Sequence, residues 1–210
     1  LLFIASFIFC FPQKNDHKPT GYIFPEFSKG VVLMKSGVKH QKMLNYNMLT
    51  EEMVFIDNGK KLAFSDYEMQ RVDTVYLADR KFIVMDKIWL ELLYRSDFSL
   101  FAQHRCHLKD PGKPAGYGGT SQTQASDSYS SLITAGAVYE LELPDDYGTS
   151  PYKIYTLVKN GETIKFVSMR QLKKYYEEKK DLVNTYIKEK DIEFNNPDDI
   201  LELIKYLEGS

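Results

Sequence analysis

The chain has 210 residues, and its 27 basic side chains nearly balance 29 acidic ones, which leaves a formal net charge of −2. Hydrophobic residues make up 43% of the sequence and charged residues 27%, values that exclude a disordered tail, a collagen-like repeat and a multi-span membrane protein. A chain of this length buries roughly 70% of the surface exposed by its unfolded form, which suffices for a core without disulfides. The balanced charge predicts no nucleic-acid partner.

The first eleven residues, LLFIASFIFCF, are all uncharged and almost all apolar, and Pro12 ends the run. The apolar region of a secretory signal spans about 7–15 residues, whereas a membrane-spanning helix needs about 20. Charged residues follow at Lys14 and Asp16. We therefore expect residues 1–13 to be a truncated signal peptide and the protein to be exported: periplasmic, outer-membrane-associated or secreted, without a transmembrane span. A buried N-terminal strand is the alternative.

Short runs of β-branched and aromatic residues, separated by turn residues, predict an antiparallel β domain over residues 20–167. Asn58-Gly59 and Asn160-Gly161 predict two-residue hairpin turns, because both central positions of a type I′ turn require positive φ. Such short connections favour antiparallel pairing. The expected fold is mainly β (α+β overall), with an antiparallel meander sheet that forms a sandwich or a partly open barrel. Strands are predicted at residues 30–35, 40–47, 53–57, 61–64, 73–77, 81–85, 89–94, 98–106, 138–143, 152–158 and 163–167.

Residues 109–134 form a long polar loop within this domain, rich in Gly, Pro, Ser, Thr and Gln. Structureless loops longer than about 12–15 residues are uncommon and are often functional. The segment lacks the Lys and the following helix of a phosphate-binding P-loop. Its tyrosines could stack on a sugar or a peptide, or only pack the loop against the sheet. The candidate ligand-binding residues are Tyr117, Gly118, Gly119, Thr120 and Tyr129.

After residue 167 the hydrophobic period becomes helical, and residues 168–210 are expected to form a two- or three-helix C-terminal unit. Ser168 and Gln171 make a capping box, and a second helix is expected after Asp181. Asn196 is expected to cap a third helix, with Pro197 at its first position. About 40 residues are too few to fold alone, so the unit should pack on the β domain.

The densest group of metal-ligand side chains is His104, Cys106 and His107, at the end of a predicted strand. Zinc prefers nitrogen and sulfur donors, so a weak metal site is one hypothesis. Two strand-end histidines beside a buried cysteine are the other. No helix start or Gly-rich turn follows Cys106, as a nucleophilic thiolate would favour. No G-x-S-x-G or H-E-x-x-H motif occurs, so no catalytic residue and no cofactor are predicted.

Three stretches carry a resemblance: KMLNYN at residues 42–47 leading to EMVF at 52–55 (after Thr-Glu), GYGGTSQT at 116–123, and the tail at 168–207. Together they resemble uncharacterised exported proteins of Gram-negative bacteria, which have a leader, a β-rich body and a short helical tail. The resemblance implies an envelope or extracellular setting and supplies no catalytic residues. We expect an exported, non-enzymatic module that binds an envelope protein or a glycan. The alternative is a hydrolytic enzyme or a weak metal-binding protein with its site near His104, Cys106 and His107.

Overall fold

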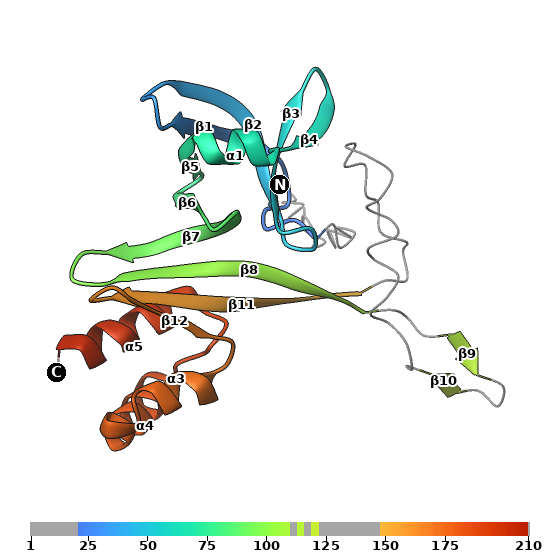
Figure 1. Cartoon of the computed structure of the whole chain (residues 1–210). Helices are drawn as coiled ribbons and strands as arrows, with labels where there is room; N and C mark the ends of the chain where they lie inside the picture. Colours follow the sequence, from blue (N-terminus) through green and yellow to red (C-terminus); the bar gives the residue numbers. More distant parts are fainter. Residues whose placement is uncertain (1–20, 110–112, 116–118, 122–147, 210) are drawn as a thin grey trace, which may run out of the picture.

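The computed structural model describes residues 21–109, 113–115, 119–121 and 148–209. In this part of the chain the protein is mainly antiparallel β-sheet, with one short helix in the N-terminal half and the other helices at the C-terminal end (Figure 1). The predicted fold class is therefore confirmed. The expected signal peptide at 1–13 and the expected strand at 138–143 lie outside the described residues.

Ten strands form one open sheet in the order β12-β11-β8-β7-β6-β5-β1-β2-β3-β4, and every neighbouring pair is antiparallel. The two edge strands, β12 and β4, do not meet, so the sheet does not close into a barrel. The strands are β1 (Ser28–Met34), β2 (Lys39–Asn47), β3 (Glu52–Asp57), β4 (Lys60–Ala63), β5 (Val72–Leu77), β6 (Arg80–Met85), β7 (Ile88–Arg95), β8 (Ser99–Lys109), β11 (Gly148–Lys159) and β12 (Glu162–Phe166).

The order of the strands departs from a simple meander at one connection. Strands β1–β4 and β5–β8 are each meanders, but β5 pairs with β1, so that Val75 lies opposite Val32. The connection from β4 to β5 contains helix α1 (Asp66–Arg71), which the sequence reasoning did not predict. Ser65 caps it: the Ser65 Oγ accepts from the Glu68 N–H, and the Glu68 carboxylate accepts from the Ser65 N–H. This is the capping box that Ser-x-x-Glu encodes.

Both predicted Asn-Gly hairpin turns are confirmed by their backbone angles. Asn58 and Gly59 have φ of 49° and 78°, and Asn160 and Gly161 have φ of 52° and 82°. The first turn joins β3 to β4, and the second joins β11 to β12. The turns fix the register of each hairpin, since a slip of one residue would exchange the two faces of a strand.

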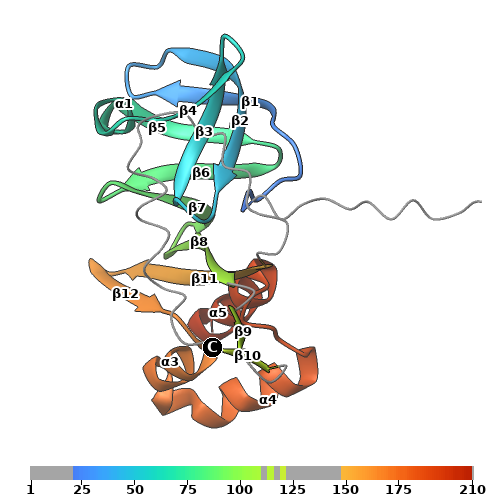
Figure 2. The same cartoon turned by 90° about the vertical axis from the view of Figure 1, so that its right-hand side faces the viewer.

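The N-terminal half of the sheet curls over itself, and β2 and β3 cross in front of β5–β7 (Figure 2). The Tyr46 ring on β2 stacks on Phe82 of β6 at 5.8 Å between centroids, and Phe64 meets Trp89 of β7 edge-on at 5.5 Å. These contacts enclose a first hydrophobic core, the curl core. Its buried residues are Val32, Leu44, Tyr46, Met53, Met69, Val72, Val75, Leu77, Phe82 and Trp89.

The C-terminal helices cover the other part of the sheet, around β8, β11 and β12 (Figure 1). They are α3 (Met169–Tyr175), the short 3-10 helix η1 (Glu177–Lys179), α4 (Lys180–Lys190) and α5 (Pro197–Gly209). None of the helices described is long and apolar enough to cross a bilayer. The helices and strands enclose a second core, the helix core. Its buried residues are Phe98, Leu100, Ala102, Tyr155, Leu157, Phe166, Leu172, Tyr176, Val183, Ile192, Ile200, Leu203, Ile204 and Leu207.

The helix caps agree with the sequence in position and differ in one detail. The Asn196 side chain accepts from the Asp198 N–H at the start of α5, as expected. The Ser168 Oγ accepts from the Gln171 N–H, but the Gln171 side chain accepts from Val167 rather than from Ser168. One hydrogen bond of the predicted capping box at α3 is therefore present, and the other is made by the N–H of Val167 in place of the N–H of Ser168.

The long polar segment also differs from the expectation of a loop without secondary structure. Strands β9 (Lys113–Ala115) and β10 (Gly119–Ser121) form a separate two-stranded antiparallel sheet within it. Strands β8 and β11 are also longer than predicted. Their pairing extends from Ser99 opposite Val158 at one end to Lys109 opposite Gly148 at the other. The long β8–β11 ribbon extends beyond both cores toward β9 and β10 (Figure 1).

Candidate functional site

A band of charged and polar side chains separates the two hydrophobic cores on the same face of the sheet. Glu91 on β7 lies opposite Phe82 of the curl core on one side and opposite Ala102 of the helix core on the other. Side chains alternate between the two faces along each strand, so Arg80 on β6, His104 on β8 and Lys153 on β11 point to the same face as Glu91. We call this band the polar seam; it consists of Arg80, Glu91, His104 and Lys153.

Glu91 and His104 form a buried pair at the centre of the polar seam. The imidazole Nε2 of His104 contacts Oε2 of Glu91, and Nη1 of Arg80 lies 3.7 Å from the same oxygen. Glu91 is 7% exposed and His104 is 3% exposed. An ionised carboxylate only accepts hydrogen bonds, so Nε2 is the donor. Since both contacts use Oε2, Oε1 of Glu91 accepts no hydrogen bond from the described residues.

The electrostatics of the polar seam favour a neutral imidazole. Burial lowers the pKa of His104 below its ordinary value, and the hydrogen bond and charge of Glu91 oppose that shift only in part. Burial also lowers the pKa of Lys153, and the nearby Arg80 lowers it further. The Glu91 carboxylate therefore has the Arg80 guanidinium as its cationic neighbour and the neutral His104 imidazole as its hydrogen-bond donor.

Lys153 connects the polar seam to the helices. It lies opposite His104 in the β8–β11 register, and its Nζ donates to the carbonyl oxygen of Asn195 at 2.7 Å, just before α5. Two residues along β11, Tyr155 is fully buried, and its hydroxyl has no hydrogen-bond partner among the described residues. Burial raises the pKa of Tyr155, and the charges of Glu91, Asp199 and Asp198 add to that rise.

The polar seam opens into a cleft of about 650 Å³, which we call the seam cleft. Its walls are residues 79–81 at the β5–β6 turn, residues 91–95 of β7, and residues 196–198 at the start of α5. The lining contains cations at Arg80, Lys81 and Arg95 and carboxylates at Asp79, Glu91 and Asp198. Its volume lies within the range of about 300–1,000 Å³ that is typical of sites for small ligands.

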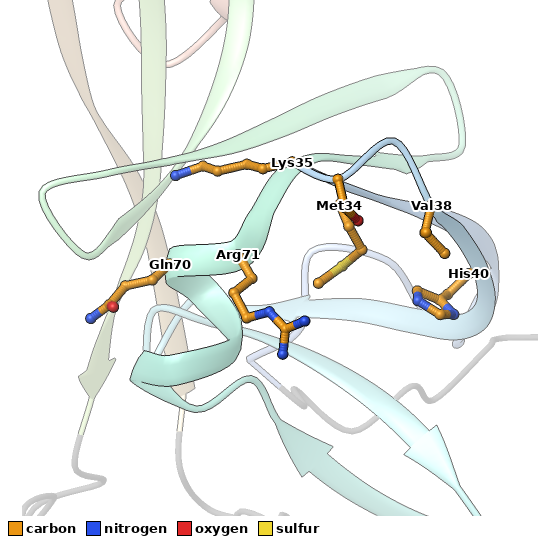
Figure 3. Close-up of a pocket in the computed structure, with 7 residues that line it drawn as sticks. Met34, Lys35, Val38, His40, Gln70 and Arg71 are labelled. Carbon is orange, nitrogen blue, oxygen red and sulfur yellow. The ribbon is translucent and has the colours of Figure 1, made fainter.

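A smaller hollow of about 280 Å³, the hairpin pocket, lies between the β1–β2 turn and the end of α1 (Figure 3). Its lining holds basic, polar and apolar side chains and no carboxylate. The lining residues are Met34, Lys35, Ser36, Val38, His40, Gln70 and Arg71.

The three candidate metal ligands are not brought together. His104 lies in the polar seam, whereas His107 is exposed and stacks on Tyr152 with the ring centroids 4.2 Å apart. Residues 104 and 107 face opposite sides of a strand. Cys106 is a free thiol whose pKa is raised by burial, which disfavours the thiolate that a nucleophile or a metal ligand needs. The described part of the chain holds no group of three or more His, Cys, Asp or Glu that could bind a metal ion.

The candidate ligand-binding residues of the polar loop are only partly described. Tyr117, Gly118 and Tyr129 lie outside the described residues. Gly119 and Thr120 begin β10, where they pair with residues 115 and 114 of β9. Their role in binding stays a prediction.

Sequence reasoning missed Glu91, Arg80 and Lys153. A signal was present for Glu91, which stands alone among apolar residues in the stretch Ile-Trp-Leu-Glu-Leu-Leu of β7. A lone carboxylate inside a buried strand needs partners, because an unpaired buried charge is costly. The partners themselves carry no such signal, since an Arg or a Lys on a strand is usually exposed.

Comparisons of the chain with family models, with curated proteins and with solved structures found no match.

Proposed function

We propose that the protein is an exported, non-enzymatic binding module that holds a glycan in the seam cleft. The observation that carries this proposal is the buried carboxylate of Glu91 at the wall of the cleft. Arg80 and His104 hold it through one oxygen, while the described residues leave the other oxygen without a hydrogen bond. A carboxylate held in this way is an oriented acceptor for a ligand hydroxyl.

The charges around the seam cleft favour a ligand rich in hydroxyl groups. A hydroxyl both donates and accepts, so it can use the cations Lys81 and Arg95 as donors and Asp79 and Asp198 as acceptors. A lining with one sign of charge would instead attract an ion of the opposite sign. The mixed lining supports a neutral polar ligand, and the cleft has room for a short oligosaccharide.

Export rests on the apolar run at residues 1–11 and the charged residues that follow it. Fusion of residues 1–20 to alkaline phosphatase, a reporter that is active only after export, tests this part. We expect activity in the exported fraction, and replacement of Ile4 and Phe7 by lysine should abolish it. A fusion that carries the unchanged leader and shows no phosphatase activity, although the fusion protein is made, would contradict export.

A hydrolytic enzyme remains the second candidate, and the His104–Glu91 contact is the observation that favours it. A histidine oriented by a carboxylate is a common general base. Here, however, the imidazole is enclosed, with Tyr46 and Phe82 at 6.3 and 6.4 Å between ring centroids. A base with 3% of its surface exposed has little access to a substrate, which favours a binding role.

The binding proposal is tested with an array of neutral and acidic oligosaccharides, followed by calorimetry with the strongest binder. We expect Lys81→Ala and Arg95→Ala each to weaken binding by about 3- to 10-fold, as the loss of one solvent-accessible hydrogen bond does. Lys165→Ala on β12 removes an exposed lysine outside the cleft and should leave the affinity unchanged. The absence of binding to every oligosaccharide would overturn the choice of a glycan.

Two further measurements separate the alternatives. Release of reducing ends from the bound oligosaccharide, lost in Glu91→Gln, would overturn the non-enzymatic role. The variants Tyr117→Ala and Tyr129→Ala test the polar loop. If they abolish binding while the two cleft variants keep full affinity, the glycan site lies in the polar loop and not in the seam cleft.

A further inference from the structure

The hairpin pocket is built from two elements that backbone hydrogen bonds hold together. The Lys35 N–H donates to the carbonyl oxygen of Arg71 at 2.8 Å, which joins the β1–β2 turn to the last residue of α1. Within the turn, the Met34 N–H donates to the Val38 carbonyl oxygen at 2.8 Å. The Arg71 carbonyl oxygen thus already accepts a hydrogen bond within the protein. These backbone hydrogen bonds hold the β1–β2 turn and the end of α1 in a fixed relative position, and both form the wall of the pocket.

The lining of the hairpin pocket has one sign of charge. Lys35, His40 and Arg71 contribute basic groups, and no Asp or Glu lines the pocket. Within the described ranges neither Lys35 nor Arg71 takes part in an ion pair. These cations therefore have no anionic partner in the described structure.

The Arg71 side chain is held in place by an aromatic residue. Its Nη1 donates to the Tyr67 hydroxyl at 3.1 Å, and its guanidinium lies 5.3 Å from the centre of the Tyr67 ring. One N–H group is used in this way, and a guanidinium has five. The remaining donors are available to a ligand, in the planar arrangement that suits two oxygens of one anionic group.

Apolar surface lies next to these donors. Figure 3 shows the Arg71 guanidinium, the His40 imidazole and the Val38 side chain around the Met34 side chain, whereas Lys35 and Gln70 extend away from them. Val38 is 50% exposed, and Met34 is only half-buried. The pocket thus presents the Arg71 guanidinium and the His40 imidazole on either side of the Met34 side chain, with Val38 next to His40 (Figure 3).

We propose that the hairpin pocket binds an organic oxyanion: a carboxylate, sulfate ester or phosphate ester attached to a small apolar group. The Arg71 guanidinium and the His40 imidazole would hold the oxyanion, and Met34 and Val38 would contact the apolar group. A volume of about 280 Å³ lies just below the range of about 300–1,000 Å³ that is typical of small-ligand sites, which favours a ligand of one small unit.

This site is independent of the seam cleft, because the two share no lining residue. Failure of the glycan proposal therefore leaves the oxyanion proposal intact, and the reverse also holds. The two sites also predict different ligands, since the seam cleft mixes both signs of charge and the hairpin pocket carries only one.

The test titrates isotope-labelled protein with butanoate, butyl sulfate, butyl phosphate, acetate and butanol, with backbone amide shifts recorded by NMR. We expect at least one butyl oxyanion to shift the amides of residues 34–40 and 70–72, and the three butyl oxyanions show which anionic group is preferred. Acetate should bind several-fold more weakly than butanoate, because it lacks the apolar group. Butanol should not bind, because it lacks the charge.

Variants connect the shifts to the named side chains. Arg71→Gln should weaken butyl oxyanion binding by about tenfold, the effect of losing a charge-assisted pair. Val38→Ser should weaken butanoate more than acetate. Lys39→Gln is the matched control. It removes a positive charge next to His40 on β2, but the side chains of residues 39 and 40 point to opposite faces of the strand, so Lys39 does not line the pocket. Its affinity should equal that of the unchanged protein, and unchanged melting temperatures confirm that all variants fold.

Three outcomes would overturn the proposal. The first is a set of shifts that lies away from residues 34–40 and 70–72. The second is binding of butanol as strong as that of the oxyanions, which would indicate a purely apolar hollow. The third is an equal loss of affinity in Lys39→Gln and Arg71→Gln, which would indicate nonspecific attraction to a basic hairpin.

Discussion

Oε2 of Glu91 accepts a hydrogen bond from Nε2 of His104 at the point where the sheet passes from one hydrophobic core to the other. Removal of one partner from such a buried pair leaves the other charge or donor unpaired, which is usually more costly than the pair is stabilising. The pair therefore fixes how the two halves of the sheet meet, and it holds the carboxylate at the wall of the seam cleft.

The buried imidazole makes stability depend on pH. Since the folded-state pKa of His104 lies below its ordinary value of about 6.5, acid protonates the unfolded chain before the folded one. This contribution is present above pH 6.5 and is lost as the pH falls through the folded-state value. We expect urea unfolding to show stability falling from pH 7 to pH 5, and less steeply in His104→Gln. Thr156→Val, a buried change without a titrating group, should keep the original slope, and an identical slope in His104→Gln would contradict this account.

The Tyr46 hydroxyl reaches across the curl of the sheet and donates to the backbone carbonyl of His104 at 3.1 Å. Tyr46→Phe removes this hydrogen bond and keeps the ring against Phe82, so we expect a loss of about 1 kcal/mol in unfolding free energy. Tyr46→Ala also creates a cavity and should cost about 3–5 kcal/mol. Chemical denaturation of both variants measures the two losses, and equal losses would show that the ring contributes nothing.

Glu208 ties the end of α5 to the sheet. Burial would raise the pKa of Glu208, but the hydrogen bonds from Lys159 and Tyr176 hold it below its ordinary value of 4.5. Stability from this group is present above pH 4.5 and is lost as the pH falls through the lower folded-state value. The Tyr176 hydroxyl donates to Oε1 at 2.6 Å, so Glu208→Gln should cost about 1.5 kcal/mol at pH 7.

The difference in unfolding free energy between Glu208→Gln and the unchanged protein should become smaller as the pH is lowered below 4.5. The reason is that the Glu208 carboxylate of the unchanged protein then becomes protonated and loses its charge. Glu189→Gln, on an exposed position of α4, is the matched control and should change stability by less than about 0.5 kcal/mol. A difference between Glu208→Gln and the unchanged protein that is independent of pH would rule out the charge as its cause.

Gly30 lies where β1 passes very close to its neighbours. A Cβ at this position would lie 2.7 Å from the Leu44 side chain and 2.7 Å from the carbonyl oxygen of Tyr76. The Tyr76 backbone is fixed in β5, so Gly30→Ala should overpack the sheet and cost about 1–3 kcal/mol. Gly209→Ala meets no atom within 4 Å and serves as the control. Equal melting temperatures for the two variants would show that β1 can shift away.

The local features of the fold could be predicted from the sequence, and the non-local ones could not. Asn58-Gly59 and Asn160-Gly161 specify their turns through their own backbone preferences. The pairing of β1 with β5 places Val32 opposite Val75, 43 positions along the chain, and no local preference selects that neighbour. Helix α1 was missed although Ser65 and Glu68 carried its capping signature, because six residues give too little periodicity to outweigh the strands around it.

The candidate site was harder to predict for the same reason. His104 was singled out as a metal ligand, but its partner is Glu91, thirteen residues earlier on the adjacent strand. The seam cleft also needs residues 196–198 of α5, which come against the sheet only after the helices fold onto it. A sequence shows which side chains can carry charge, whereas the neighbours of each depend on pairings that span most of the chain.

The position of β11 beside β8 has a consequence for the order of events during protein synthesis. Strand β8 ends at residue 109 and its partner begins at residue 148, so the ribosome must add about 40 residues before the first pairing is possible. Until then the nascent chain exposes an unpaired strand edge next to the completed curl, the kind of surface that favours aggregation. A chaperone that shields this edge, or slow translation before residue 148, would therefore change the yield of native protein more than its final stability.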